Sequence, residues 1–452
     1  MKFENVVILA SVLSLAACSS RDRGSPDQGA SPSTRPAASA HQARAVVEYK
    51  NGQWFDGNQF VSGSRYTADG VLHSTRPAGA TATTVIDLRN GHVVPPYGEG
   101  HTHLLEAELI DTYVHHFLYR GIYYVKDQSS PPWVREQIAS KVNKLTSIDV
   151  RWANQGFTGP GGHPLQIMKQ MQTLGAIPAD WSAEKLATET AIAIADEAGL
   201  DARWPGFLAG KPDFVKVFLL YSEEYDKRKD TPEYEHRRGI DPALVPAVVA
   251  RARSAGLEVS AHVYTAADFR AAVEAGVSQI AHMPGIGFDE TLGPDAFKLG
   301  EIDARRAAEK GVSVITTLSE LVEDMRVSPE VGEYFTDVVA MNYKLLRDAG
   351  VPILIGSDRF RSACDTEAVY LSELGLMDNL TLLKTWTEAT PQMIFPDRKI
   401  GKLTDGYEAS FLVLDGNPLD DPANLLRIGL RVKQGQILVV KNARFAAPVA
   451  RE

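Results

Sequence analysis

Short apolar runs that end in a histidine, a lysine or an aspartate recur across most of this chain. Such runs are typical of β-strands, and a reactive side chain that closes a strand is a frequent site of function. The residues concerned are His101, His103, Lys216, His262, His282 and Asp358. His101 and His103 lie on one face of their strand, because strand side chains alternate with a period of two. Imidazole and carboxylate groups are good ligands of divalent metals, so the set predicts a metal site.

Strand-like runs alternate with helical stretches from about residue 97 to residue 395. Further candidate strands lie at 121–126 and 312–316, and amphipathic segments lie at 243–255 and 266–275. Alternating strands and helices imply a parallel sheet, and eight such units close into a barrel. Functional groups of that fold lie at the carboxyl ends of the strands, which is where the six polar residues fall.

The order and the surroundings of the six residues resemble the amidohydrolase superfamily of metal-dependent hydrolases. Within it they are most similar to the imidazolonepropionase and prolidase-like branch. The resemblance covers roughly residues 46–446 and includes the stretches 85–88, 93–96, 389–391, 400–406 and 412–418. Two positions depart from the family pattern. Gly100, preceded by Glu99, stands where the family usually has Asp before the first His, and Ser410 stands where the late motif usually reads Ala-Asp.

The resemblance implies a fold class and a domain organisation. It implies an α/β protein whose (β/α)8 TIM barrel spans residues 97–395. The flanks at 46–96 and 396–446 contain short strand-like pieces, and in the family the two flanks pair into a small β-sandwich. A folded length of roughly 400 residues suits one barrel with such an appendage.

The resemblance also implies two divalent metal ions bound by the six residues. The first histidine pair would hold the more buried ion with Asp358, and the two later histidines would hold the exposed ion. Lys216 matches the family lysine whose neutral amine takes up CO2, and the resulting carbamate bridges the metals; buried lysines readily lose their proton. Asp358 would act as general base and then general acid for a metal-activated water. The ligand types favour zinc, with manganese, cobalt or iron as alternatives.

Two further residues resemble substrate-binding groups of prolidase-like dipeptidases. His163 follows a Gly-Gly pair, and Tyr264 lies two residues after a predicted ligand, on the same face of its strand. Both would bind the carboxylate end of the substrate; a loop histidine and a core tyrosine are the alternative interpretations. The charged run 222–238 is either a solvated face or a lid over the site. Arg359 and Arg361 are either further carboxylate-binding residues or surface residues.

These features predict a hydrolase of C–N bonds in small amides, with dipeptides or N-acyl amino acids as first candidates and cyclic amides as second. Lactone or phosphotriester hydrolysis on the same scaffold is an alternative, and a non-catalytic lipoprotein that binds metal or another ligand is an alternative of a different class. The net charge of −10 without a basic stripe argues against nucleic acid as a partner. The sequence does not determine the oligomeric state.

Residues 1–18 are typical of the export signal of a bacterial lipoprotein. An apolar run at 6–15 is too short to span a bilayer, and it leads into Leu-Ala-Ala-Cys, which ends at Cys18. This tetrapeptide resembles the lipobox, in which the cysteine receives lipid and becomes the mature N-terminus; an ordinary secretory signal is the alternative. Ser19 in place of Asp favours an outer-membrane anchor that faces the periplasm. Residues 19–45 lack large apolar side chains and predict a disordered tether.

We expect Cys18→Ser to abolish lipidation, because the thiol is the atom that carries the lipid. The variant should remain unprocessed or be misplaced in the cell envelope. Membrane fractionation together with mass spectrometry of the N-terminus measures both effects. A soluble wild-type protein that is cleaved at another position would contradict the lipoprotein prediction.

Overall fold

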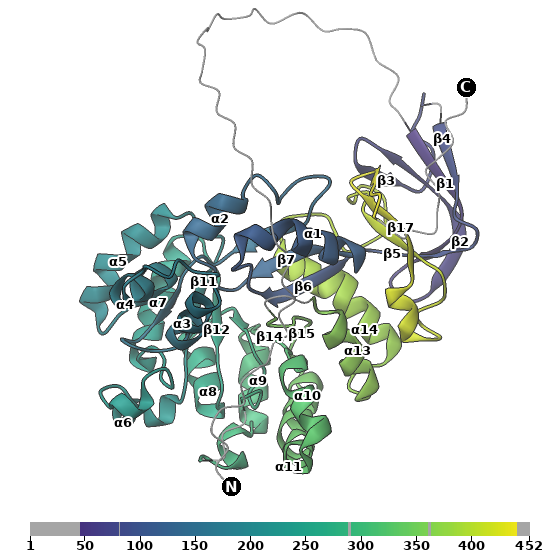
Figure 1. The fold of residues 1–452 in the computed structure, drawn as a ribbon. Helices are drawn as coiled ribbons and strands as arrows, with labels where there is room; N and C mark the ends of the chain where they lie inside the picture. The colour runs from purple at the N-terminus through teal and green to yellow at the C-terminus, as the bar shows by residue number, and fades with distance from the viewer. Residues whose placement is uncertain (1–45, 81, 288–290, 360–362, 441–452) are drawn as a thin grey trace, which may run out of the picture. The chain divides into compact units, whose positions relative to one another are not determined.

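The computed structural model describes residues 46–440 except 81, 288–290 and 360–362 (Figure 1). All of them belong to one compact unit, 43–452. The predicted signal peptide with Cys18, the whole predicted tether 19–45 and Arg361 lie outside the described residues. Within the described ranges, no helix is both long enough and apolar enough to cross a bilayer.

One eight-stranded sheet combines the two flanks of the chain (Figure 1). Its strands are β1 (Val46–Phe55), β2 (Phe60–Ala68), β3 (Val71–His73), β4 (Ala82–Asp87), β5 (His92–Val94), β16 (Phe411–Leu414), β17 (Ile428–Lys433) and β18 (Gln436–Ile437). Strand β16 pairs antiparallel with β5, and Val413 lies opposite Val93. The predicted β-rich appendage is therefore present as a sheet shared by both flanks, whereas the predicted domain bounds stay a prediction.

The strands between the flanks form two parallel sheets. One contains β6 (Tyr97–Thr102), β7 (Ile122–Asp127) and β8 (Asp149–Trp152). The other contains β9 (Gly156–Thr158), β10 (Ala191–Ala193), β11 (Val215–Phe218), β12 (Val259–His262), β13 (Gln279–Ile280), β14 (Ser313–Ile315) and β15 (Ile353–Leu354). The strands predicted at 121–126 and 312–316 correspond to β7 and β14. Strands β6, β7, β11 and β12 are buried along their whole length, as expected for strands covered on both faces.

Helices connect these parallel strands, as the alternating pattern predicted. They are α1 (Ile110–Tyr119), α2 (Pro132–Ile138), α3 (Leu165–Thr173), α4 (Ala183–Thr190), α5 (Glu197–Ala209), α6 (Tyr225–Arg228), α7 (Val245–Ser254), α8 (Ala266–Ala275), α9 (Glu301–Glu309), α10 (Ser319–Val327), α11 (Pro329–Tyr334), α12 (Met341–Asp348), α13 (Asp365–Glu373), α14 (Asn379–Lys384) and α15 (Thr390–Ile394). Helix α8 has the predicted bounds. It begins after Thr265, which forms a capping box with Asp268, and it ends at Gly276 with φ 84°.

Backbone hydrogen bonds connect the two parallel sheets at two places. The N–H of Gly100 in the edge strand β6 donates to the carbonyl of Ile355 after the edge strand β15, at 2.9 Å. The N–H of Asp213 before β11, which lies inside its sheet next to β9, donates to the carbonyl of Trp152 in the edge strand β8, at 2.8 Å. A Cβ atom on Gly100 would lie 2.8 Å from the Ile355 oxygen, so only glycine allows this close approach. The departure from the family pattern at Gly100 therefore has a steric reason.

Candidate metal centre

The parallel strands bring the predicted metal ligands together from different parts of the chain. His101 lies in β6 and His103 directly follows it, Lys216 lies in β11, and His262 is the last residue of β12. His282 and Asp358 follow β13 and β15. Because the strands are parallel, their carboxyl ends meet at one edge, and these side chains meet there too.

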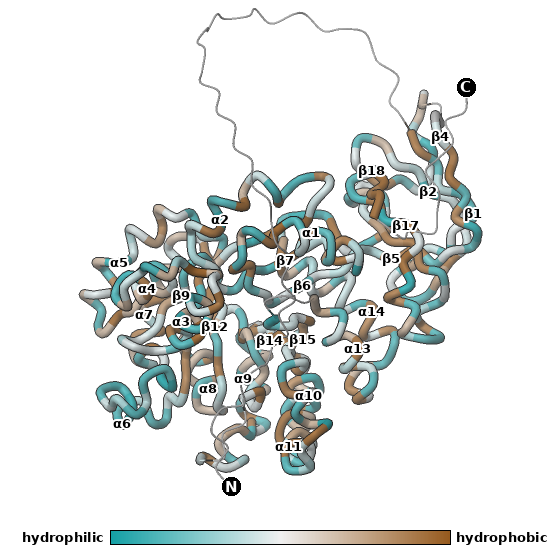
Figure 2. Tube along the Cα trace, in the orientation of Figure 1, coloured by the Kyte–Doolittle hydropathy of each residue, from teal (hydrophilic) through white to brown (hydrophobic). Residues whose placement is uncertain are grey.

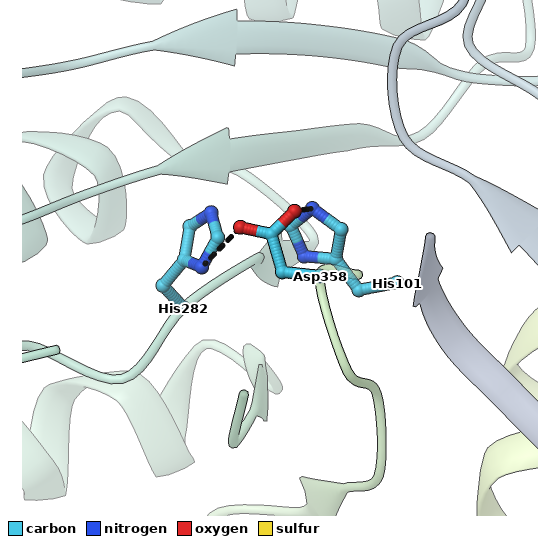
Figure 3. Close-up of side chains that lie close together, drawn as sticks. All are labelled: His101, His282 and Asp358. Atoms are coloured by element: carbon cyan, nitrogen blue, oxygen red, sulfur yellow. Dashed lines mark ion pairs between the residues drawn. The ribbon is translucent and has the colours of Figure 1, made fainter. Parts of the chain in front are cut away.

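The carboxylate of Asp358 is the centre of the cluster. Its Oδ1 atom lies 3.1 Å from Nε2 of His101 and 3.0 Å from Nε2 of His103, and its Oδ2 atom lies 3.6 Å from Nδ1 of His282. Figure 3 shows the carboxylate between the rings of His101 and His282. One ligand atom from each of these three residues lies within 4.8 Å of the others, a grouping that can hold a metal ion.

A row of rings extends from this cluster to the predicted substrate-binding residues. The ring centroids of His282 and His262 are 4.4 Å apart. His262 in turn stacks on His163 at 4.6 Å and lies 4.7 Å from the ring of Tyr264. The structure therefore places both His163 and Tyr264 beside a predicted metal ligand. Lys216 is also buried here, and its charge affects the pKa of the neighbouring histidines.

Hydrogen bonds to backbone oxygens orient the first two histidines. Nδ1 of His101 lies 2.8 Å from the carbonyl oxygen of Ala281, and Nδ1 of His103 lies 3.0 Å from that of Ser129. A carbonyl only accepts, so each Nδ1 is the protonated nitrogen, and each Nε2 faces the carboxylate of Asp358. Among the described residues, the buried Nε2 atoms of His101 and His262 have no hydrogen-bond partner. Buried ring nitrogens without such a partner fit ligands of a metal ion.

Burial determines the protonation states at the centre. It lowers the pKa of His101 to about 4 and holds the pKa values of His262 and His282 well below their ordinary value. Burial also lowers the pKa of Lys216 to about 7, so a large fraction of its amine is neutral near pH 7. For Asp358, burial alone would raise the pKa, but the nearby histidines and their hydrogen bonds lower it well below its usual range. The site thus surrounds an ionised carboxylate with neutral nitrogen atoms that can bind a metal ion.

Glu99 is a residue of the site that the sequence analysis noted only as part of a departure from the family pattern. Its fully buried carboxylate accepts hydrogen bonds from the backbone N–H of His101 (3.0 Å) and from the N–H and hydroxyl of Ser357 (both 2.9 Å). Burial raises the pKa of Glu99 to about 8. Glu99 therefore ties β6 to the residue before Asp358. Its signal in the sequence was an acidic residue inside an otherwise buried strand.

The charged run 222–238 forms short helical pieces, including α6, and Figure 2 shows this region as mostly hydrophilic. Arg228 is buried within it, and its Nε donates to the carboxylate of Glu224 at 2.7 Å. The carbonyl of Arg238 accepts from the N–H of His163 at 2.9 Å. The run is thus attached to the loop that carries His163. Its predicted role as a lid stays a prediction.

Comparisons with known proteins agree with this architecture. No protein-family profile matches the chain. An ochratoxinase from Aspergillus niger is 28% identical over 204 residues, which are 43% of this chain and 39% of the relative; the match thus spans less than half of that relative's length. The solved structure of A. niger ochratoxinase has a TM-score of 0.66 at 17% identity and covers 88% of this chain and 96% of its own.

Two further solved structures have the same fold. One is named an amidohydrolase (TM-score 0.65, 20% identity, 88% of this chain and 100% of that chain). The other is a Xaa-Pro dipeptidase with methionine bound in its active site (TM-score 0.66, 18% identity, 87% of this chain and 99% of that chain). The chain therefore has the α/β fold of amidohydrolase-type structures.

The buried neutral histidines predict how the stability of the metal-free protein depends on pH. The unfolded chain binds protons at these rings below pH 6.5, whereas folded His101 does so only near pH 4. The contribution of these rings to the free energy of unfolding is therefore fully present above pH 6.5. It falls as the pH decreases toward 4, by about 1.4 kcal/mol per pH unit for each such ring. Urea unfolding of the chelator-treated protein at several pH values measures the slope.

A variant distinguishes these rings from other titrating groups. His282→Asn should reduce the slope of the free energy of unfolding against pH, between pH 6.5 and pH 4, by about the contribution of one ring. The reason is that burial holds the pKa of His282 well below its ordinary value. An unchanged slope in this variant would show that other groups cause the acid sensitivity.

Proposed function

We propose that this chain is a metal-dependent hydrolase of C–N bonds in small amides. The observation that carries the proposal is the carboxylate of Asp358 enclosed by histidines whose ring nitrogens converge on it. The names of the similar proteins support the same chemistry, because they include an ochratoxinase, an amidohydrolase and a Xaa-Pro dipeptidase. A molinate hydrolase and a phenylurea hydrolase are also similar in fold.

The scaffold of this proposal is a closed (β/α)8 barrel. The hydrogen bonds from Gly100 to Ile355 and from Asp213 to Trp152 support it, because they connect β6 to the end of β15 and β8 to the start of β11. With these two connections, the eight strands of the proposed barrel would be β6, β7, β8, β11, β12, β13, β14 and β15. A site at the carboxyl ends of eight strands would explain why ligands come from such distant parts of the sequence.

The residues fit two divalent metal ions, with zinc as the first choice for imidazole and carboxylate ligands. The proposed ligands are the six predicted residues, with Asp358 and the first histidine pair on one ion and His262 and His282 on the other. Lys216 would bridge the ions as a carbamate formed from CO2; its buried amine, with a pKa of about 7, supports this assignment. Bound metal ions of this kind supply Lewis acidity that activates water and polarises a carbonyl.

The residues of the chain would then perform the proton transfers. Asp358 is ionised at neutral pH, because its histidine neighbours hold its pKa well below the usual range. Its carboxylate would accept the proton of the attacking water and deliver that proton to the leaving nitrogen, which must be protonated to depart as an amine. Glu99 would position this carboxylate through Ser357.

Dipeptides and N-acyl amino acids are the proposed substrates. The ring row that joins His163 and Tyr264 to His262 supports this choice, because it places two hydrogen-bonding side chains next to the centre. Cyclic amides, lactones and phosphotriesters are the alternative substrates on the same scaffold. We also propose that the mature protein is anchored by lipid at Cys18 in the cell envelope.

Replacing Lys216 tests the proposed function. Lys216→Ala should lose most bound metal and most amidase activity, because the bridging ligand is gone. Added acetate or propionate should restore part of both by occupying the place of the carbamate. Metal analysis together with hydrolysis of a dipeptide library measures the effect. Full metal content and turnover in Lys216→Ala would show that the lysine is not a ligand.

The assignment of His163 and Tyr264 is tested by a pair of substrates. If they bind the substrate carboxylate, His163→Ala and Tyr264→Phe should keep the metal and lower kcat/KM roughly ten- to hundredfold, since a hydrogen bond to a charged group contributes about 1.5–3 kcal/mol. The loss should be smaller for substrates whose carboxylate is masked as an amide. Asp358→Asn should instead depress kcat on both substrates. Equal losses for the two residues on free and masked substrates would mean that they only shape the pocket.

A further inference from the structure

A further carboxylate lies near the loop that carries Asp358, at the start of the helix after β14. Glu320 is the second residue of α10, and Arg359 directly follows Asp358. Nη2 of Arg359 donates to the carbonyl of Ser319 at 2.6 Å, and its Nε lies 3.6 Å from Oε1 of Glu320. The loops after β14 and β15 are therefore tied together, and Glu320 lies next to the loop that carries Asp358.

The charge of Glu320 affects the candidate site. Burial and the negative charge of Asp358 together raise the pKa of Glu320 to about 8. The pKa of Tyr264 is raised by burial and also by the charges of Asp358 and Glu320. Through Arg359, Glu320 is linked to the loop of Asp358, a proposed metal ligand, and its charge also raises the pKa of Tyr264, a proposed substrate-binding residue.

Glu320 is incompletely paired. Its only recorded partner among the described residues is Arg359, at a distance longer than a normal hydrogen bond. The side chain keeps 31% of its surface exposed, so a ligand can reach it. Because this ion pair has no hydrogen bond, Arg359 compensates the partly buried carboxylate only in part, and a cationic group of a ligand would add to that compensation.

We propose that Glu320 binds the ammonium group of a substrate with a free amino terminus, and that the enzyme therefore prefers dipeptides to N-acyl amino acids. This inference rests on the proposed function. In a dipeptide the ammonium group is attached to the carbon next to the scissile carbonyl, so it must lie close to Asp358. An N-acyl amino acid has no cation there. With the carboxylate end held by hydrogen bonds from His163 and Tyr264, and the ammonium end by Glu320, each charged end of a dipeptide would have its own binding group.

The test compares a dipeptide with its N-acetyl counterpart, using the metal-loaded protein. The wild type should hydrolyse the free dipeptide with the higher kcat/KM. Glu320→Gln keeps the size of the side chain and removes its charge, so kcat/KM for the free dipeptide should fall roughly ten- to hundredfold, mainly through KM. The value for the N-acetyl substrate should be unchanged or higher. Glu320→Asp should retain part of the preference.

A control on the same helix removes the same charge elsewhere. Asp324 lies one turn after Glu320 in α10, so Asp324→Asn should leave the values for both substrates close to those of the wild type. If Glu320→Gln slows both substrates equally, or loses bound metal, the ammonium site is wrong while amide hydrolysis stands. If the metal-loaded wild type cleaves neither substrate nor any other amide, the proposed function is overturned and this inference with it.

Discussion

The buried carboxylate of Asp358 among neutral imidazoles is the arrangement on which the rest of the account depends. An ionised carboxylate taken out of water needs compensating positive charge. The histidines around it supply little, because burial holds the pKa of His101 near 4 and that of His282 well below its ordinary value. Lys216, with a pKa of about 7, supplies only part of it. A bound divalent cation would provide the missing charge, and the same ring nitrogens and carboxylate could bind it.

The backbone around this carboxylate is organised to hold it in place. Asp358 has a left-handed conformation (φ 55°), which is uncommon for a residue other than glycine, and its N–H donates to the carbonyl of His101 at 2.7 Å. Glu99 accepts hydrogen bonds from the N–H and the hydroxyl of the preceding residue, Ser357. Gly100 and Gly356 allow the strands to approach, since a Cβ atom on Gly356 would lie 2.6 Å from the backbone nitrogen of His101. The two glycines, the buried Glu99 and the left-handed backbone of Asp358 thus together fix the position of this carboxylate.

The sequence predicted the parts of this structure that depend on local pattern. The His-x-His pair, the alternation of strands and helices and the bounds of α8 follow from side-chain periodicity and capping residues, which are visible along the chain. The ion pair of Glu320 with Arg359 and the hydrogen bonds of Glu99 depend on which strands become neighbours, and that is a tertiary property. In the sequence, Glu320 simply lies at the start of a segment with the pattern of an amphipathic helix. Its place near Asp358 becomes evident only after β14 and β15 pair.

Anomalous diffraction from crystals grown with zinc locates bound metal independently of activity. We expect two peaks at the carboxyl ends of the parallel strands. One peak should lie at ligand distance, about 2.0–2.2 Å, from nitrogen or oxygen atoms of His101, His103 and Asp358, and the other from those of His262 and His282. Lys216 should lie between the two peaks. Zinc peaks only at surface residues, with none at Asp358, would contradict the account.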